Sequence, residues 1–145
     1  MAYIRAAVDT LALRTVPRET NDCTVRALAA AANIDYSLAH RLMAKHGRQF
    51  GQGTRHECQL KAYTEAGGEL RAIFGRDNGA RYRARMSPDV PHEPGITLKV
   101  LLSEIPLGRF ICIVRQHAFA IVDRKIADSG LLKAGTRINA IYRFD

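Results

Sequence analysis

The chain has no run of apolar residues long enough for a transmembrane helix, which needs about 18 or more. Its beginning, "MAYIRAAVDTLALR", is interrupted by Arg5 and Asp9 and does not contain the apolar core of a secretory signal. The chain also has no internal repeat and no low-complexity tract. We therefore expect a cytoplasmic protein that has no membrane partner.

Cysteine is scarce, with only Cys23, Cys58 and Cys112 in 145 residues. Three cysteines cannot all pair, and neither C-x-x-C nor zinc-finger spacing occurs, so we expect no disulfide framework and no structural metal. The glycine-rich segment "GRQFGQGT" (residues 47–54) has no G-K-[S/T] and follows no predicted strand, so it is not a phosphate-binding P-loop. We interpret it as a loop near the helix that carries Cys23. The sequence thus predicts no cofactor.

The composition is that of an ordinary globular protein, with 47% hydrophobic and 25% charged residues. At this length we expect a single domain over residues 1–145. The net charge is 22 − 14 = +8, and 17 of the 22 basic residues are arginine. The densest basic run, "RDNGARYRAR", provides a possible surface for an acidic protein partner, through Arg76, Arg81, Arg83 and Arg85. Because no nucleic-acid-binding motif accompanies it, nucleic acid is not expected as the main partner.

Helical patterns come first along the chain. Apolar residues recur at helical spacing over residues 22–32, and Thr20, Asn21 or Asp22 can cap this helix. A second helix is predicted over residues 36–46, with Leu38 and Leu42 on one face. A third is predicted up to the glycines at 67 and 68, starting with a capping box of Thr54 and Glu57. Thr97 is the predicted cap of a short fourth helix.

Strand patterns dominate the end of the chain. The segment "ELRAIF" predicts a short strand, and residues 75–95 predict a long irregular excursion. "RFICIVR", "HAFAIVD" and "RINAIYRF" are rich in β-branched and aromatic residues, and turn residues bound them. The order predicts an α+β fold in which N-terminal helices pack on a C-terminal antiparallel sheet. We interpret Cys58 and Cys112 as core residues of this fold.

Cys23 lies in the first turn of the first predicted helix. Unpaired amides and the positive end of the helix dipole favour a thiolate there, and the same amides can stabilise an oxyanion. A free cysteine is also often a small buried hydrophobic residue, and Asp22 places a negative charge nearby. This segment alone therefore leaves both interpretations open.

His117 lies between two apolar strand segments, where a histidine is unexpected. Alternation places it on one strand face with Phe119 and Ile121. A hairpin turn at 123–124 returns the chain beside this strand, so that Asp128 can approach His117. A cysteine, a histidine and an acid in this order form the set needed for nucleophilic catalysis. Taken singly, His117 can also be a core or edge residue, and Asp128 can cap a turn.

The segments "NDCTVRALA" and "GRFICIVRQHAFAIVDRKIADSG" resemble papain-like cysteine peptidases. They are most similar to the small double-glycine-leader-peptidase-like proteins found in bacteriophages and bacteria. The resemblance implies a papain-like fold and hydrolysis of a peptide or isopeptide bond, with Cys23 as nucleophile, His117 as base and Asp128 as orienting acid. It also implies a host-cytoplasm location if a phage encodes the chain.

The chain departs from this family at one position. Papain-like enzymes often carry a glutamine about six residues before the cysteine, and Pro17 stands there in this sequence. Asn21 is the predicted substitute for this oxyanion donor. The alternative is a catalytically inactive papain-like module, a phage or bacterial factor, that binds an acidic host protein or nucleic acid through its arginine-rich segment. The segment "CTVRALA" is also similar to ovarian-tumour-type deubiquitinases, but Thr20 stands where they have an aspartate.

Overall fold

The structure is a computed structural model of the chain that describes residues 3–5, 20–73, 96–127 and 131–144. These residues form an α+β fold with four helices, a five-stranded antiparallel sheet and a separate pair of short strands. The helices are α1 (Cys23–Ala32), α2 (Tyr36–Lys45), α3 (His56–Glu65) and α4 (Leu98–Glu104). The strands are β1 (Tyr3–Arg5), β2 (Gly68–Ile73), β3 (Arg109–Val114), β4 (His117–Val122), β5 (Lys125–Ala127), β6 (Leu131–Lys133) and β7 (Ala140–Phe144).

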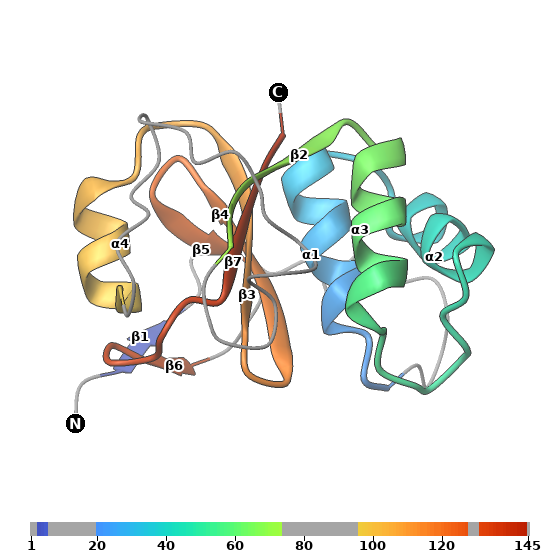
Figure 1. Cartoon of the computed structure of the whole chain (residues 1–145), viewed down its shortest axis with the longest axis horizontal. Helices are drawn as coiled ribbons and strands as arrows, with labels where there is room; N and C mark the ends of the chain where they lie inside the picture. Colours follow the sequence, from blue (N-terminus) through green and yellow to red (C-terminus); the bar gives the residue numbers. More distant parts are fainter. Residues whose placement is uncertain (1–2, 6–19, 74–95, 128–130, 145) are drawn as a thin grey trace.

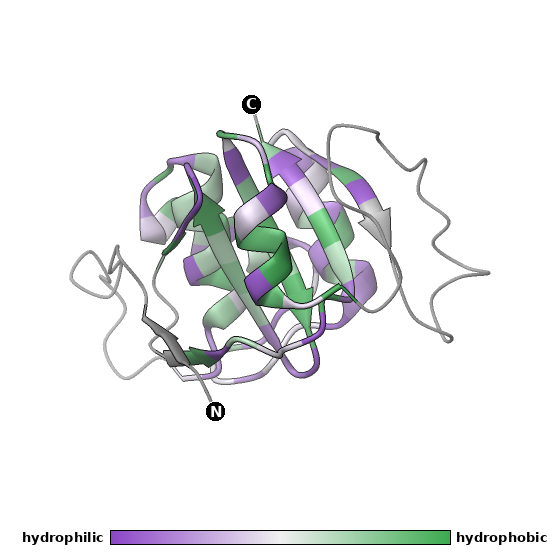
Figure 2. Cartoon of the chain, turned by 90° about the vertical axis from the view of Figure 1, so that its left-hand side faces the viewer, coloured by the Kyte–Doolittle hydropathy of each residue, from purple (hydrophilic) through white to green (hydrophobic). Residues whose placement is uncertain are grey.

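The five-stranded sheet has the order β2-β7-β3-β4-β5 and separates two helical layers. Helices α1, α2 and α3 lie on one side of it and α4 lies on the other (Figure 1). Each layer has its own buried apolar cluster. Figure 2 is viewed from the side of α4 and shows the hydrophobic strands of the sheet behind this helix. The expected packing of helices on an antiparallel sheet is confirmed.

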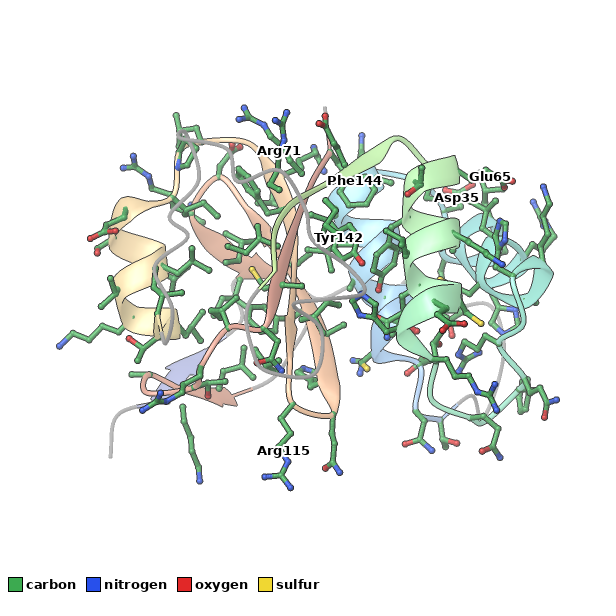
Figure 3. The ribbon with its side chains drawn as sticks, viewed as in Figure 1. Asp35, Glu65, Arg71, Arg115, Tyr142 and Phe144 are labelled. Carbon is green, nitrogen blue, oxygen red and sulfur yellow. The ribbon has the colours of Figure 1, made fainter. Side chains whose placement is uncertain are left out.

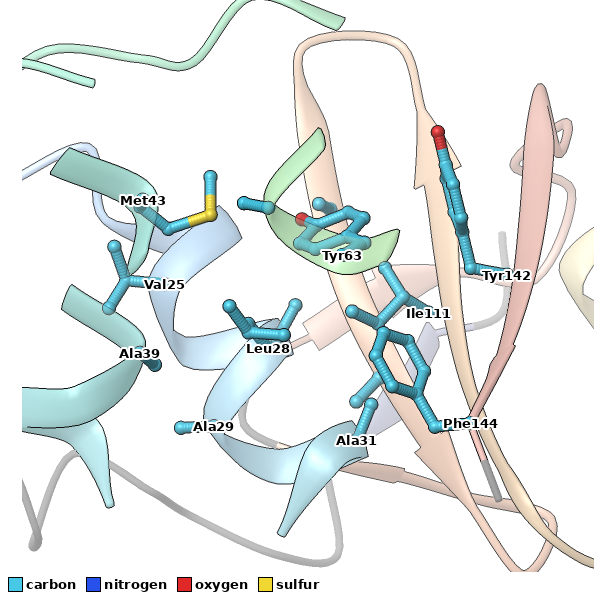
Figure 4. Close-up of a cluster of buried hydrophobic side chains, with 14 of the residues drawn as sticks. Val25, Leu28, Ala29, Ala31, Ala39, Met43, Tyr63, Ile111, Tyr142 and Phe144 are labelled. Atoms are coloured by element: carbon cyan, nitrogen blue, oxygen red, sulfur yellow. The ribbon is translucent and has the colours of Figure 1, made fainter. Parts of the chain in front are cut away.

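Helix α1 packs against the sheet through small residues. Alanine has the highest helix propensity, and its short side chain allows a helix to approach a strand closely. Ala27 and Ala31 of α1 and Ala118 and Ala120 of β4 are all buried in one cluster. Leu28 is fully buried at its centre, where Tyr63 of α3 and Tyr142 of β7 also lie (Figure 4). The helix beginning at Cys23 thus packs closely against the strand beginning at His117.

One detail of the predicted helices holds in part and another is wrong. In α2 the buried residues are Tyr36, Ala39 and Met43, and of the predicted apolar pair Leu42 packs partly buried against the core whereas Leu38 is exposed. Thr54 does not cap α3, because Arg55 is the N-cap residue and makes no side-chain capping bond. The hydroxyl of Thr54 instead forms a hydrogen bond of 2.8 Å with the hydroxyl of Thr24. The bounds of α1, α2 and α3 nevertheless agree with the prediction to within about two residues.

Helix α4 begins as predicted, since the Thr97 hydroxyl accepts a hydrogen bond from the Val100 amide at 3.5 Å. Leu98 and Leu101 of α4 are buried against the far face of the sheet. The strand pair β1–β6 was not expected from the sequence. Its partners, such as Tyr3 and Lys133, are far apart in the chain, so no local pattern reports the pairing.

The strands β3, β4 and β5 form two successive hairpins that place the candidate site. The β3–β4 turn contains Arg115 and Gln116, and Figure 3 shows Arg115 pointing away from the body of the protein. The predicted turn at Asp123 and Arg124 is confirmed, and both residues have positive φ, as a two-residue hairpin loop requires. The amide of Gly108 donates to the Asp123 carboxylate at 3.0 Å and fixes this turn.

Candidate active site

Cys23 and His117 line the same cavity, whose volume is about 490 Å³. Its wall is formed by the first residues of α1, by residues 53–56 and Gln59 before and within α3, and by the end of the β3–β4 hairpin. In Figure 1 the beginning of α1 and the β3–β4 turn lie at the same, lower end of the molecule. Two residues separated by 94 positions in the chain (117 − 23) therefore line one cavity.

Cys23 is the first residue of α1 and is half-buried. The N-cap residue is Asp22, whose side chain makes no capping hydrogen bond to the amides of the first turn. The first amides of a helix have no partner within the helix itself. The thiol thus stands at the positive end of a helix dipole, where an anion is stabilised.

The Asp22 carboxylate is buried and turned towards α2. It accepts a hydrogen bond of 2.8 Å from the Tyr36 hydroxyl and forms an ion pair of 3.2 Å with Arg26. Asp22 therefore repels a thiolate at Cys23 less than an unpaired carboxylate would, because the guanidinium of Arg26, one turn along α1, matches its negative charge.

A buried arginine holds the segment that leads into α1. Arg48 is 6% exposed, and its Nη2 donates to the carbonyl oxygens of Thr20 at 3.2 Å and of Asn21 at 3.3 Å. From the same loop, the Gly51 carbonyl accepts a hydrogen bond of 3.0 Å from Asn21 Nδ2. The expectation that "GRQFGQGT" lies near the Cys23 helix is confirmed. The role of Arg48 was missed because its partners are 27 and 28 residues away.

Asn21 is exposed, and its amide is directed to the loop at Gly51. Its predicted role as an oxyanion donor stays a prediction. Gln59 is a second candidate for an oxyanion donor, since it lines the cavity, unlike Asn21, and is only 7% exposed. Gln59 Nε2 donates to the Thr54 carbonyl at 2.9 Å, which fixes the amide and leaves its second N–H available. Sequence reasoning missed Gln59 because it lies on α3, far from Cys23 in the chain.

His117 is the first residue of β4, and its ring stacks on that of Phe119 with centroids 6.0 Å apart. The predicted alternation is confirmed, because Phe119 lies in the cluster on the α4 side and Ala118 in the cluster on the α1 side. The His117 ring thus shares the strand face of Phe119, and the residue reaches the Cys23 cavity at the start of the strand. Burial lowers the pKa of His117 from its ordinary value of 6.5, and the charge of Arg26 lowers it further. The imidazole is therefore neutral at pH 7 and can accept a proton.

His56 is a second histidine in the cavity, to which the sequence assigned no function. Burial lowers the pKa of His56, and the nearby charge of Glu57 partly opposes this effect. The described residues that line the cavity thus include the thiol of Cys23 and two histidines, His56 and His117, that are neutral at pH 7.

The other cysteines differ from each other. Cys112 is fully buried in β3, as predicted, and burial strongly raises the pKa of its thiol. The interpretation of Cys58 as a core residue is wrong, since it is half-buried and lines a second cavity of about 500 Å³. Gly47 lies against it, so that a Cβ at this position would stand 3.1 Å from Cys58 Sγ.

Several predicted site residues lie outside the described residues: Asp128, Arg76, Arg81, Arg83 and Arg85. Pro17 lies outside them as well. Strand β5 ends at Ala127, which is the register partner of Ala120 in the His117 strand. The predicted function of Asp128 therefore stays a prediction.

The neutral histidines predict a dependence of stability on pH. His56 and His117 bind protons less readily in the fold than in the unfolded chain, because their pKa values are lowered from 6.5. Below that pH the unfolded state takes up more protons, so the free energy of unfolding falls as the pH falls towards the folded pKa values. We expect urea unfolding at a lower midpoint at about pH 5.5 than at about pH 7.5.

The control for this prediction is the double variant His56→Asn, His117→Asn. Asparagine does not titrate in this range, so the difference between the two midpoints should shrink. An undiminished difference in the double variant would show that other groups cause the acid sensitivity.

Within the parts of the chain that the structure describes, no group of three or more histidine, cysteine, aspartate or glutamate side chains could hold a metal ion. A search of the same residues found no helix with both the length and the apolar character to cross a membrane. Comparisons with protein-family models, with curated proteins and with solved structures gave no match.

Proposed function

We propose that this chain is a papain-like cysteine hydrolase that cleaves a peptide or isopeptide bond. The observation that carries the proposal is the cavity shared by Cys23 and His117. A cysteine at the start of a helix, packed against an antiparallel sheet whose strand begins with a histidine, supports the papain-like assignment. The predicted orienting acid is Asp128, which follows directly after β5.

In the first half of the proposed reaction, His117 accepts the thiol proton of Cys23 and the sulfur attacks the carbonyl carbon. The tetrahedral oxyanion accepts hydrogen bonds from the Cys23 amide and from Gln59, which we favour over Asn21 because Gln59 lines the cavity. The C–N bond then breaks, and the proton on His117 passes to the leaving amine. The product of this half is a thioester on Cys23 and a free amine.

In the second half, water attacks the thioester and His117 takes one of its protons. The C–S bond breaks, the carboxylic acid leaves, and the proton returns to the Cys23 sulfur. An amine in place of water would give transfer instead of hydrolysis by the same steps. The proposed chemistry uses only side chains and a backbone amide of this chain, together with water.

The proposal is tested by the rate at which iodoacetamide labels each cysteine at about pH 6, where few ordinary thiols are ionised. We expect Cys23 to react at least about tenfold faster than Cys58, because Cys23 lies at a helix N-terminus and shares its cavity with the proposed base His117. Mass spectrometry of tryptic peptides identifies each labelled site. His117→Ala should slow the labelling of Cys23 and leave that of Cys58 unchanged.

Cys58 is a matched internal control, since it is half-buried and lines a cavity of similar size. If Cys23 labels no faster than Cys58 and His117→Ala has no effect, the chain is not a cysteine hydrolase. That result would leave the papain-like module as a binding protein.

A further inference from the structure

The cavity of Cys23 and His117 adjoins the second cavity, and the two share Gly53 and Arg55. The second cavity is lined by Gly47, Gln49, Gln52, Gly53, Arg55 and Cys58. At Gly53 an added Cβ would meet no heavy atom within 4 Å, so this residue leaves open space where the cavities meet. An extended ligand that reaches Cys23 can continue past Gly53 into the second cavity.

Arg55 is the only charged side chain at pH 7 among the described residues that line these cavities. The two histidines of the first cavity are neutral at that pH, because their pKa values are lowered. The other lining residues have uncharged side chains, except that the thiols of Cys23 and Cys58 become negative when they ionise. Among the residues that the structure describes, the joined cavities therefore present a single fixed positive charge.

The groups around the cavities do not cancel this charge. Arg55 is exposed and forms no ion pair with a carboxylate of the described residues. Glu57 acts on His56 but lines neither cavity. Arg26, whose charge reaches His117, is already paired with Asp22.

We propose that Arg55 is a specificity residue that selects substrates with an acidic side chain close to the bond that Cys23 attacks. The peptide substrate in this proposal rests on the proposed function, whereas the preference for an anion follows from the lining of the cavities. A guanidinium forms two parallel hydrogen bonds with a carboxylate, so it favours aspartate or glutamate over neutral residues of the same size. A lysine at the same substrate position meets a like charge and is disfavoured.

The first experiment compares two alkylating probes that differ in charge, iodoacetate and iodoacetamide. The ratio of their labelling rates at Cys23 reports attraction of an anion into the cavity and does not require hydrolysis. We expect Arg55→Gln to lower this ratio about threefold to tenfold, as for the loss of one charge at short range in a partly shielded site. Concentrated salt should reduce the ratio of the unmodified protein towards that of the variant.

Arg137→Gln is the matched control, because it removes the same charge from an exposed residue that lines neither cavity. The backbone of Arg137 forms an isolated antiparallel β-bridge with Thr97, which precedes α4 on the other side of the sheet. A lowered ratio in Arg137→Gln equal to that in Arg55→Gln would overturn the proposal, because the effect would then come from net charge alone. An unchanged ratio in Arg55→Gln would overturn it as well.

The second experiment extends the test to peptides, with tripeptide chloromethyl ketones that carry Glu, Gln or Lys at one position and glycine elsewhere. We expect alkylation of Cys23 in the order Glu, Gln, Lys, and the reverse order in Arg55→Glu. The same order in both proteins would overturn the proposal. Failure of the proposed function is seen separately, as slow labelling of Cys23 by every probe, whereas failure of the Arg55 proposal is seen in the ratios.

Discussion

Cys23→Ala should lose the burst of nitrophenolate that the unmodified protein is expected to release from p-nitrophenyl acetate. A nucleophilic cysteine takes the acetyl group faster than water removes it, so about one nitrophenolate appears per chain before steady turnover. Because this ester is activated, the test requires no knowledge of the natural substrate. His117→Ala should slow the burst by about 100-fold to 10,000-fold, the usual contribution of a general base. Nitrophenolate absorbance gives the rate, and mass spectrometry locates the acetyl group.

Two controls sharpen this experiment. Cys58→Ala removes a half-buried thiol from the adjoining cavity and should leave the burst intact. Asp128→Asn should slow the burst, whereas Asp123→Asn removes the same charge from the β4–β5 turn and should not. An acetyl group on Cys58, or a full burst in Cys23→Ala, would contradict the assignment of the nucleophile.

The helices and strands could largely be predicted because their patterns are local. The alternation in "HAFAIVD" follows directly from the two faces of β4, which pack against different helices. The hairpin at Asp123 and Arg124 could be predicted because turn residues separate two strand patterns. The predicted cap at Thr97 forms for the same reason, since its partner Val100 is three residues away.

The errors have a common physical cause, which is that tertiary contacts outweighed a local preference. In α2, Tyr36 and Ala39 are buried and Leu38 is exposed, because the Tyr36 hydroxyl donates to the buried Asp22 carboxylate. Thr54 did not cap α3 because its hydroxyl is bonded to Thr24. In both cases the partner lies on α1 or at its start and could not be identified from the local sequence.

The sequence pointed to Cys23 and His117, which line one cavity, but not to the residues around them. Cys23 and His117 stood out because each is chemically unusual in its own segment, a helix start and an apolar strand. Arg48 and Gln59 did not stand out, because an arginine in a loop and a glutamine in a helix are ordinary until the fold buries them. The charge that the described residues give the cavities depends in the same way on Arg55, an arginine that is ordinary in the sequence.

Asp22→Ala should lower the free energy of unfolding by about 2 to 3 kcal/mol, since it removes one member of a buried ion pair. The side chain of Asp22 is 5% exposed and that of Arg26 is 19% exposed, so the remaining guanidinium is only partly solvated. The Tyr36 hydroxyl also loses the acceptor that it bonds at 2.8 Å. Urea unfolding measures the loss. Asp22→Asn should cost less, because its amide oxygen can still accept from Tyr36.

Asp35→Ala is the matched control, because Asp35 is likewise the N-cap aspartate of a helix without a side-chain capping bond, yet it is exposed. It should change the free energy of unfolding by less than about 0.5 kcal/mol. An equal loss in both variants would show that position at a helix start, and not the buried pair, causes the effect.

The same substitution also connects the fold to the chemistry. Burial lowers the pKa of His117, the charge of Arg26 lowers it further, and in Asp22→Asn that charge acts without the neighbouring carboxylate. The pKa of His117 should therefore fall further, whereas in Arg26→Gln it should rise. Titration of the His117 ring protons by NMR measures both shifts. The Asp22–Arg26 pair lies at the start of the Cys23 helix. Opposite shifts in the two variants are expected only if the charges of this pair also act on the pKa of His117.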